Sequence, residues 1–205
     1  MNAAGTLHSG AEKIGLKLDF DTQQKMLAYL ALMRKWNKTY NLTAISEEHD
    51  MVIHHLLDSL AVLPYLWEGK WLDVGCGAGV PGAILAIARP DWQFTLLDSN
   101  SKKTSFVQQA AIELDLSNIK VHSGRVEDWP TTERFDGIIS RAFAELEKFT
   151  NLTGHLLAAE GRWAAMKGKL EEKVPLGCTI EQTIQIHVPG LGADRSLVIA
   201  AKKRE

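Results

Sequence analysis

The amino-acid sequence predicts an α/β protein with a mostly parallel sheet, helices on both faces of the sheet, and an antiparallel pair of strands that closes one end. Three observations predict this fold class. Residues 1–69 show only helical periodicity, short apolar runs alternate with helical stretches from residue 70 onward, and the last two runs are joined by a short connection. We therefore expect an N-terminal helical extension, residues 1–69, that packs on a core formed by residues 70–205.

The extension is expected to contain two main helices. Asp21 and Gln24 resemble a capping box at the start of the first helix, whose apolar positions recur on one face as far as Trp36. After a polar turn, Ser46 is expected to cap the second helix, because acids occupy the following turn and the apolar face continues to Pro64.

The core is expected to contain the strands. The parallel ones are predicted at Trp71–Val74, Phe94–Leu97, Ile119–Val121, Gly137–Ile139 and Trp163–Met166, with helices from Pro81, over Lys102–Leu114 and near Leu146–Leu157. Only Pro-Gly-Leu-Gly-Ala-Asp-Arg separates Thr183–Val188 from Ser196–Ala201. Because this connection has no room for a crossover helix, the last two strands must be antiparallel.

Composition excludes several classes of protein. With 45% hydrophobic and 23% charged residues, the 205-residue chain has the composition of a globular protein. The longest nearly unbroken apolar stretch, Val80–Ala88, is far shorter than the roughly 20 residues that span a bilayer. The start lacks the pattern of a secretory signal, and Cys76 and Cys178 are too few for a disulfide framework, so we expect a cytoplasmic protein with no membrane partner. A net charge of −2 means that contacts with phosphates would depend on local basic clusters.

The strongest local signal is a glycine-rich turn after the first strand, Asp73-Val-Gly75-Cys-Gly77-Ala-Gly79-Val-Pro-Gly82. Glycines allow a sharp turn and let a ligand approach the backbone. Asp98 ends the second strand, where a carboxylate can accept hydrogen bonds from ribose hydroxyls. A tight turn without a ligand is the alternative, but the order of strand, glycines, helix, strand and acid favours a nucleotide-like ligand.

The glycine pattern also fits a dinucleotide-binding turn, for which Asp98 lies at the expected distance. Two features favour a different ligand. Asp73 lies at a strand end that would normally be apolar in a dinucleotide site, and it can either fix the loop or meet an amine-bearing ligand. No tyrosine has a lysine four residues further on, so the Tyr-x-x-x-Lys pair of many dehydrogenases is absent. The arrangement resembles the Rossmann-like, class I methyltransferases, whose cofactor is S-adenosylmethionine.

The methyl acceptor is narrowed by the motifs that the sequence lacks. No two prolines are adjacent, so the Asn/Asp-Pro-Pro-aromatic motif of exocyclic amine methylation is missing. Neither Cys76, inside the glycine turn, nor Cys178 is a good candidate for the thiolate that carbon methylation requires. A ring nitrogen with a free lone pair needs no base, only correct orientation, so the absence of an obvious acid–base pair is consistent with such an acceptor. No catalytic side chain is assigned.

Several strings resemble one family more closely than the class as a whole. They are Trp36-Asn37-Lys-Thr-Tyr40-Asn41-Leu42-Thr43, His54-His-Leu-Leu-Asp58-Ser59, the glycine turn, Leu97-Asp98-Ser99, Gly124-Arg125-Val126-Glu127 and Ser140-Arg141-Ala142-Phe143. Over about residues 20–200 this ordered set resembles the bacterial RsmG (GidB) family. The resemblance implies methyl transfer from S-adenosylmethionine to N7 of a guanine, guanine-527, in 16S ribosomal RNA. A small-molecule methyltransferase and a nucleotide-binding oxidoreductase remain the alternatives.

Carried over by position, the resemblance implies a set of cofactor-binding residues: Gly75, Gly77, Val80, Asp98, Val126, Glu127 and Arg141. Arg141 ends the fourth strand, where its guanidinium could bind the methionine carboxylate or an RNA phosphate. A structural salt bridge from Arg141 to Asp73 or Glu145 is the alternative. No metal site is expected, because the adjacent His54 and His55 would point about 100° apart on a helix.

The implied partner is 16S ribosomal RNA, within the small ribosomal subunit or an assembly intermediate, and we expect the enzyme to act as a monomer. We expect the N-terminal helices to form a lid on the ligand edge of the sheet. RNA would be held by four lysines around the cleft, Lys38, Lys102, Lys167 and Lys169, with an unpaired base splayed out of the strand. The strings that resemble the family also contain Asn37, Tyr40, Asn41, His54 and Asp58. Structural roles remain the alternative for these five residues: a helix C-cap, a turn, and an ion pair spaced i, i+4.

Overall fold

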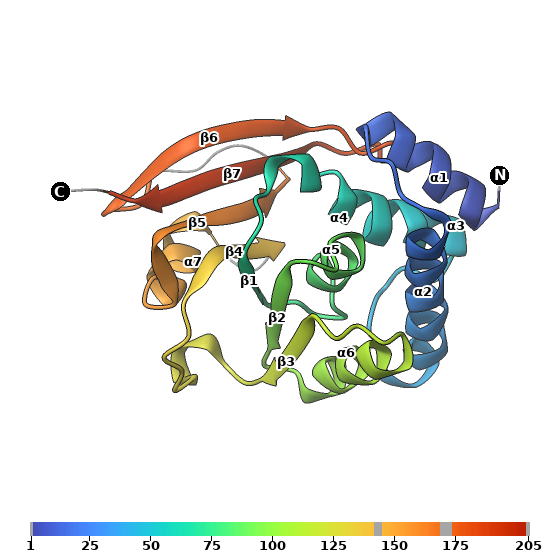
Figure 1. Ribbon diagram of the computed structural model, residues 1–205, viewed down its shortest axis with the longest axis horizontal. Coiled ribbons are helices and arrows are strands. Elements are labelled where there is room, and N and C mark those ends of the chain that lie inside the picture. Colours follow the sequence, from blue (N-terminus) through green and yellow to red (C-terminus); the bar gives the residue numbers. More distant parts are fainter. Residues whose placement is uncertain (1, 142–144, 169–173, 204–205) are drawn as a thin grey trace.

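The computed structural model describes residues 2–141, 145–168 and 174–203 of the chain (Figure 1). In these ranges seven strands form one sheet in the order β3-β2-β1-β4-β5-β7-β6. Their bounds are β1 Lys70–Val74, β2 Gln93–Asp98, β3 Ile119–Ser123, β4 Phe135–Arg141, β5 Leu157–Lys167, β6 Cys178–Ile186 and β7 Arg195–Lys202. Neighbouring strands from β3 to β5 are parallel, and β7 is antiparallel to both β5 and β6. The predicted fold class is therefore confirmed.

Helices cover both faces of the sheet. On one face lie α5 (Gly82–Ala88) and α6 (Ser101–Glu113), and on the other lies α7 (Leu146–Thr153) (Figure 1). β1 lies between β2 and β4: the chain adds β2 and β3 on one side of β1, and then β4 and β5 on the other, so the strand order reverses next to β1. Such a switch point leaves a crevice at the carboxyl ends of the strands, where ligands bind in open α/β sheets.

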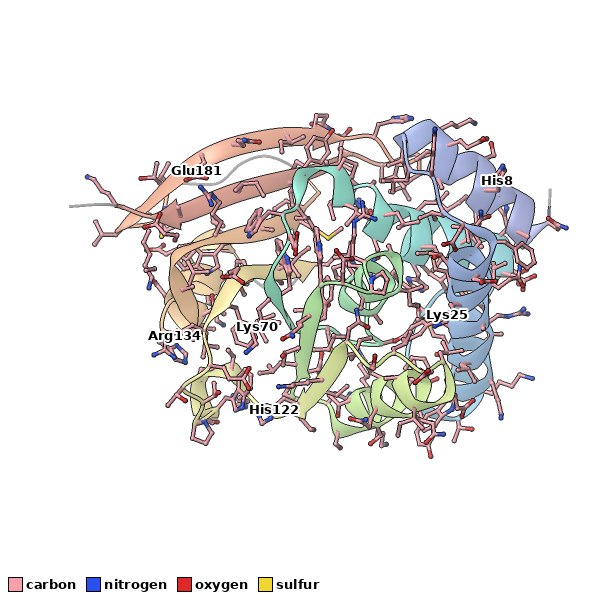
Figure 2. All side chains as sticks on the ribbon, in the orientation of Figure 1. His8, Lys25, Lys70, His122, Arg134 and Glu181 are labelled. Carbon is pink, nitrogen blue, oxygen red and sulfur yellow. The ribbon has the colours of Figure 1, made fainter. Side chains whose placement is uncertain are left out.

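The N-terminal segment consists of α1 (Ala3–Ile14), α2 (Phe20–Tyr40), α3 (Glu48–Met51), the π-helix η1 (Val52–Leu57), α4 (Asp58–Leu60) and the 3-10 turn η2 (Leu63–Tyr65). Polar side chains such as His8 of α1 and Lys25 of α2 lie on the outer surface of these helices (Figure 2). None of the helices described is long and apolar enough to cross a membrane.

Both predicted helix caps were wrong. The side chain of Asp19 accepts the Thr22 amide hydrogen at 2.7 Å, so α2 begins before Asp21, which lies in its first turn. The next helix has Glu47 at its cap position without a side-chain bond, so Ser46 lies outside it. Two other predicted ends also move. The helix at Leu146 stops at Thr153 because β5 already begins at Leu157, and β6 ends at Ile186, so Val188 belongs to the connection.

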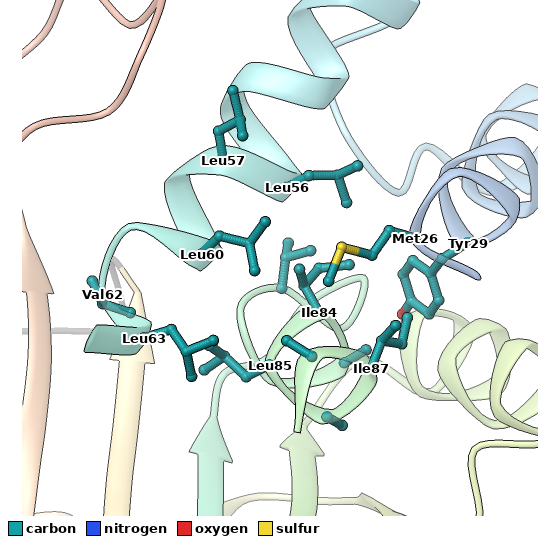
Figure 3. Packing of buried hydrophobic residues seen from close by; sticks show 14 of the residues in the cluster. Met26, Tyr29, Leu56, Leu57, Leu60, Val62, Leu63, Ile84, Leu85 and Ile87 are labelled. Atoms are coloured by element: carbon teal, nitrogen blue, oxygen red, sulfur yellow. The ribbon is translucent and has the colours of Figure 1, made fainter. Parts of the chain in front are cut away.

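The N-terminal helices and the α5–α6 face of the sheet share one continuous hydrophobic cluster. Figure 3 shows Met26 and Tyr29 of α2 and Leu56 of η1 around Ile84 of α5. Burial of side chains of this size contributes about 1.5–3 kcal/mol each. The division into an extension and a core domain stays a prediction.

Candidate functional site

The glycine-rich turn after β1 has a left-handed backbone at three positions. The φ angles of Gly75, Gly77 and Gly79 are 71°, 55° and 80°, a region that residues with a Cβ rarely adopt. The amides of Gly75 and Cys76 both donate to the Leu97 carbonyl, at 2.8 and 3.1 Å, and so tie the turn to the end of β2. The glycine turn between β1 and α5 therefore forms a backbone cradle at the carboxyl edge of the sheet.

Asp98 ends β2 at this edge and is partly exposed. Its Oδ2 accepts the Gly77 amide hydrogen at 2.9 Å and its Oδ1 accepts that of Asn100 at 2.8 Å. An ionised carboxylate has about four acceptor positions, so these two bonds leave capacity for further donors such as hydroxyl groups. Asp98 thus holds the glycine turn in addition to any contact with a ligand.

Asp73 is fully buried beneath the start of α5. Its Oδ2 accepts the Gly82 amide hydrogen at 2.8 Å, while Oδ1 has no hydrogen-bond partner among the described residues. A Cβ at Gly82 would lie 2.7 Å from this Oδ2, so only glycine fits the contact. Burial raises the pKa of Asp73 to about 7, although the bond from Gly82 and the charge of Arg141 oppose the shift. The contact supports the interpretation of Asp73 as a residue that fixes the loop.

A pocket of about 380 Å³ opens beside Asp98. Its lining consists of Gly75, Leu97, Asp98, Ser99, Gly124, Arg125, Val126, Glu127, Lys148 and Leu152. The volume is within the range of about 300–1,000 Å³ typical of small-molecule sites. The structure thus brings four of the predicted cofactor-binding residues together. We call this space the Asp98 pocket.

The three other predicted cofactor-binding residues do not line the Asp98 pocket. The amide of Gly77 points to Asp98, and Val80 is buried where the turn leads into α5. Arg141 ends β4 as predicted, but it lines a second pocket of about 360 Å³, together with Ile45, His54, His55, Asp58, Met166, Lys167, Gly168 and Arg195. We call this space the Arg141 pocket.

An ion-pair cluster organises the Arg141 pocket. Arg141 Nη1 donates to Asp58 Oδ2 at 3.0 Å and to the His54 carbonyl at 2.8 Å. Arg195 Nε donates to the other oxygen, Asp58 Oδ1, also at 3.0 Å. The alternative of a structural salt bridge thus holds for Arg141, but its partner is Asp58 and not Asp73 or Glu145. The alternative pairing of Asp58 with His54 along one helix was wrong, since Asp58 binds the two arginines. The side chain of Asp58 is only 3% exposed, so two arginines share one nearly buried carboxylate.

Arg195 was missed by the sequence prediction, which began the last strand one residue later. A usable signal existed, because β7 is antiparallel to β5, so the beginning of β7 lies at the edge where the parallel strands end. An arginine at that position faces the ligand edge of the sheet.

His55 is held by the turn after α2. Its Nε2 lies 3.0 Å from the Thr43 hydroxyl, and the Asn37 side chain binds the Thr43 backbone at both its amide and its carbonyl. Asn41 is the C-cap of α2, as one interpretation predicted. Burial, followed by the charge of Arg141, lowers the pKa of His55 to about 4, so its ring is neutral at pH 7.

The four lysines predicted to hold RNA occupy separate elements. Lys38 is exposed near the end of α2, Lys102 is exposed in the first turn of α6, and Lys167 lines the Arg141 pocket. Lys169, Ala142 and Phe143 lie outside the described residues. Within the described ranges, no group of three or more His, Cys, Asp or Glu side chains is placed to hold a metal ion.

The strand order, the antiparallel β7 and the glycine cradle define the Rossmann-like class I fold of S-adenosylmethionine-dependent methyltransferases. A solved structure of a SAM-dependent methyltransferase from Aquifex aeolicus has this fold, with a TM-score of 0.56 and 17% identity over 71% of this chain and 90% of that one. A family model described as rRNA small subunit methyltransferase G (GidB) matches residues 22–198. This chain belongs to that family, which confirms the resemblance that its motifs indicate.

Curated relatives extend over almost the whole chain. The protein named ribosomal RNA small subunit methyltransferase G from Neisseria meningitidis is 50% identical over 203 residues, which cover 96% of this chain and 97% of the relative. The protein of the same name from Methylobacillus flagellatus is 49% identical over 194 residues, 94% and 95% of the two chains.

Proposed function

We propose that this protein transfers the methyl group of S-adenosylmethionine to 16S ribosomal RNA of the small subunit, at N7 of one guanine. The family match over residues 22–198 carries the proposal. The relatives that cover at least 94% of this chain bear the name of a small-subunit ribosomal RNA methyltransferase. The arrangement of the two pockets supports the same function.

The Asp98 pocket is the proposed cofactor site. Its donor set fits the ligand, because the glycine cradle leaves room for close approach to the backbone and Asp98 retains acceptor capacity for ribose hydroxyls. Val126 and Glu127 belong to the short 3-10 turn η3 (Val126–Asp128) after β3 and line the pocket, where they would meet the adenine. When bound, S-adenosylmethionine supplies an electrophilic methyl group on a positively charged sulfur.

The Arg141 pocket is the proposed acceptor site. It lies at the carboxyl ends of β4 and β5, next to the cofactor edge, and two guanidinium groups face it. Arginine binds phosphate oxygens in a planar fork and stacks on bases, so such a pocket suits a nucleotide splayed out of an RNA strand. His54 and His55 of the π-helix η1 line the remaining side of this pocket, and the ring of His55 is neutral at pH 7.

The reaction requires no general base. The lone pair of guanine N7 forms the new bond to the methyl carbon as the bond from carbon to sulfur breaks, and the positive charge moves from sulfur to the guanine ring. No proton has to leave the nucleophile. Orientation of the acceptor against the methyl group therefore supplies most of the acceleration, and the protein contributes two adjacent, preformed pockets.

Transfer of labelled methyl from S-adenosylmethionine to small-subunit RNA, followed by nuclease mapping of the label, tests the proposal. Bare 16S RNA, an assembly intermediate and the intact subunit should be compared as substrates. One labelled 7-methylguanine is the expected result. Absence of label from all three substrates would contradict the RNA assignment and favour a small-molecule acceptor. Thermal stabilisation by NAD(P) but not by S-adenosylhomocysteine would instead indicate an oxidoreductase.

A further inference from the structure

A tyrosine of the N-terminal segment reaches the proposed cofactor turn. Tyr29 lies in α2, is fully buried, and donates its hydroxyl hydrogen to the Ala78 carbonyl at 2.9 Å. Ala78 lies between Gly77 and Gly79, in the middle of the glycine-rich turn and 49 residues away in sequence. Figure 3 shows the Tyr29 ring pointing from α2 with its oxygen directed toward the α5 region.

The turn and the tyrosine fit each other closely. A Cβ at Gly79 would overlap with the Tyr29 hydroxyl, so the backbone comes as near to this oxygen as glycine allows. Ala78 is itself only 4% exposed, so water has little access to its carbonyl. Among the described hydrogen bonds, Tyr29 supplies the donor for this carbonyl, and a buried carbonyl without a donor is costly.

The Tyr29 ring is itself fixed by neighbouring aromatic side chains. It packs edge-to-face on Phe106 of α6, with ring centroids 5.5 Å apart, and Phe106 in turn packs on Trp36 of α2 at 5.7 Å. Burial raises the pKa of Tyr29 well above 10, so the hydroxyl remains a donor at neutral pH. The donor is therefore held in one place before any ligand arrives.

We propose that Tyr29 is a positioning residue for cofactor binding, whose hydroxyl holds the Ala78 carbonyl and thereby the glycine turn in its binding geometry. The inference rests on the proposed function, because it takes this turn to bind S-adenosylmethionine. Three left-handed glycines make the turn intrinsically flexible. The apparent dissociation constant of a ligand is inversely proportional to the fraction of protein in the binding-competent conformation, so loss of this geometry weakens binding.

Tyr29→Phe tests the inference, because it removes the hydroxyl and keeps the packed ring. We expect the dissociation constant for S-adenosylhomocysteine, measured by calorimetry, to rise about two- to tenfold, the equivalent of one hydrogen bond. In methyl transfer, the KM for S-adenosylmethionine should rise by the same factor. The kcat and the KM for RNA should stay unchanged, since Tyr29 lines neither pocket.

Asn118→Ala is the matched control. The Asn118 side chain donates to the carbonyls of Ala86, Arg89 and Trp92 at the opposite edge of the sheet, so its loss lowers stability without touching the turn. We expect it to lower the melting temperature at least as much as Tyr29→Phe and to leave S-adenosylhomocysteine affinity within twofold. Hydrogen exchange on ligand-free protein should show faster exchange at Gly79 and Val80 in Tyr29→Phe only.

Three results would overturn the inference. One is unchanged S-adenosylhomocysteine affinity in Tyr29→Phe. Another is an equal loss of affinity in Asn118→Ala, which would mean that general destabilisation explains the effect. The third is a loss confined to kcat. Failure of the wild-type protein to bind S-adenosylhomocysteine would instead overturn the proposed function and this inference with it, so the two failures are distinguishable.

Discussion

Replacement of Asp58 by asparagine should destabilise the protein more than the loss of an ordinary ion pair. The carboxylate is 3% exposed and holds Arg141 through one oxygen and Arg195 through the other, each at 3.0 Å. An asparagine keeps one acceptor oxygen and turns an amide NH2 toward the second guanidinium. One charged hydrogen bond, about 1.5–3 kcal/mol, is therefore lost, and two cations remain without their shared counter-charge.

The two arginines are 24% and 26% exposed, so water offsets part of this loss. We expect the free energy of unfolding to fall by about 3 kcal/mol. For a chain of this size each kcal/mol corresponds to about 2–4 °C, so the melting temperature should fall by about 6–12 °C in differential scanning calorimetry.

Glu48→Gln is the control for the Asp58 variant. It breaks the pair between Arg34 and Glu48, whose side chains are 47% and 56% exposed at 3.1 Å. We expect a loss below about 1 kcal/mol. If Asp58→Asn melts within about 2 °C of the wild type, or no lower than Glu48→Gln, the carboxylate does not stabilise the fold and the reasoning is refuted.

Four further predictions concern the two pockets. Arg141→Lys should lose most methyl transfer, because a point charge cannot reproduce the planar fork, while its melting temperature should fall less than that of Asp58→Asn, because Asp58 keeps a positive partner. Full activity would remove Arg141 from the acceptor site. Asp98→Asn should weaken S-adenosylmethionine binding in calorimetry about tenfold or more, since the amide NH2 faces a backbone donor; equal affinity would contradict the ribose assignment. His55→Gln should flatten the acid side of the stability profile in urea titrations. The pKa of His55 is about 4 in the folded protein against 6.5 in the unfolded chain, so only the unfolded chain takes up this proton between these values. The free energy of unfolding therefore falls as the pH drops from 6.5 toward 4 in the wild type, and identical slopes in the variant would contradict this reasoning. RNA affinity should fall steeply with salt despite the net charge of −2, and a flat dependence would argue against an RNA substrate.

Helix ends show where local patterns mislead. The sequence offers two acids, Asp19 and Asp21, as caps of α2, and the capping-box spacing favours the second. In the structure Asp19 accepts the Thr22 amide hydrogen. Several residues near a helix start have the right side-chain chemistry, and the path of the incoming chain, set by packing of α1 on α2 and η1, selects among them.

Sequence alone was enough to predict the fold class, the glycine turn and the position of Asp98 at the end of β2. These features depend on neighbours in the chain: alternating periodicity, residues that tolerate a positive φ, and an acid at a strand end. Tertiary structure alone decided which charges meet. Asp58 binds Arg141 from 83 residues away and Arg195 from 137, and Tyr29 binds a carbonyl 49 residues away. A pairwise contact over such distances leaves no period or spacing in the sequence. The two ion pairs exist only because the sheet brings the end of β4 and the beginning of β7 to one edge and the N-terminal helices pack against that edge.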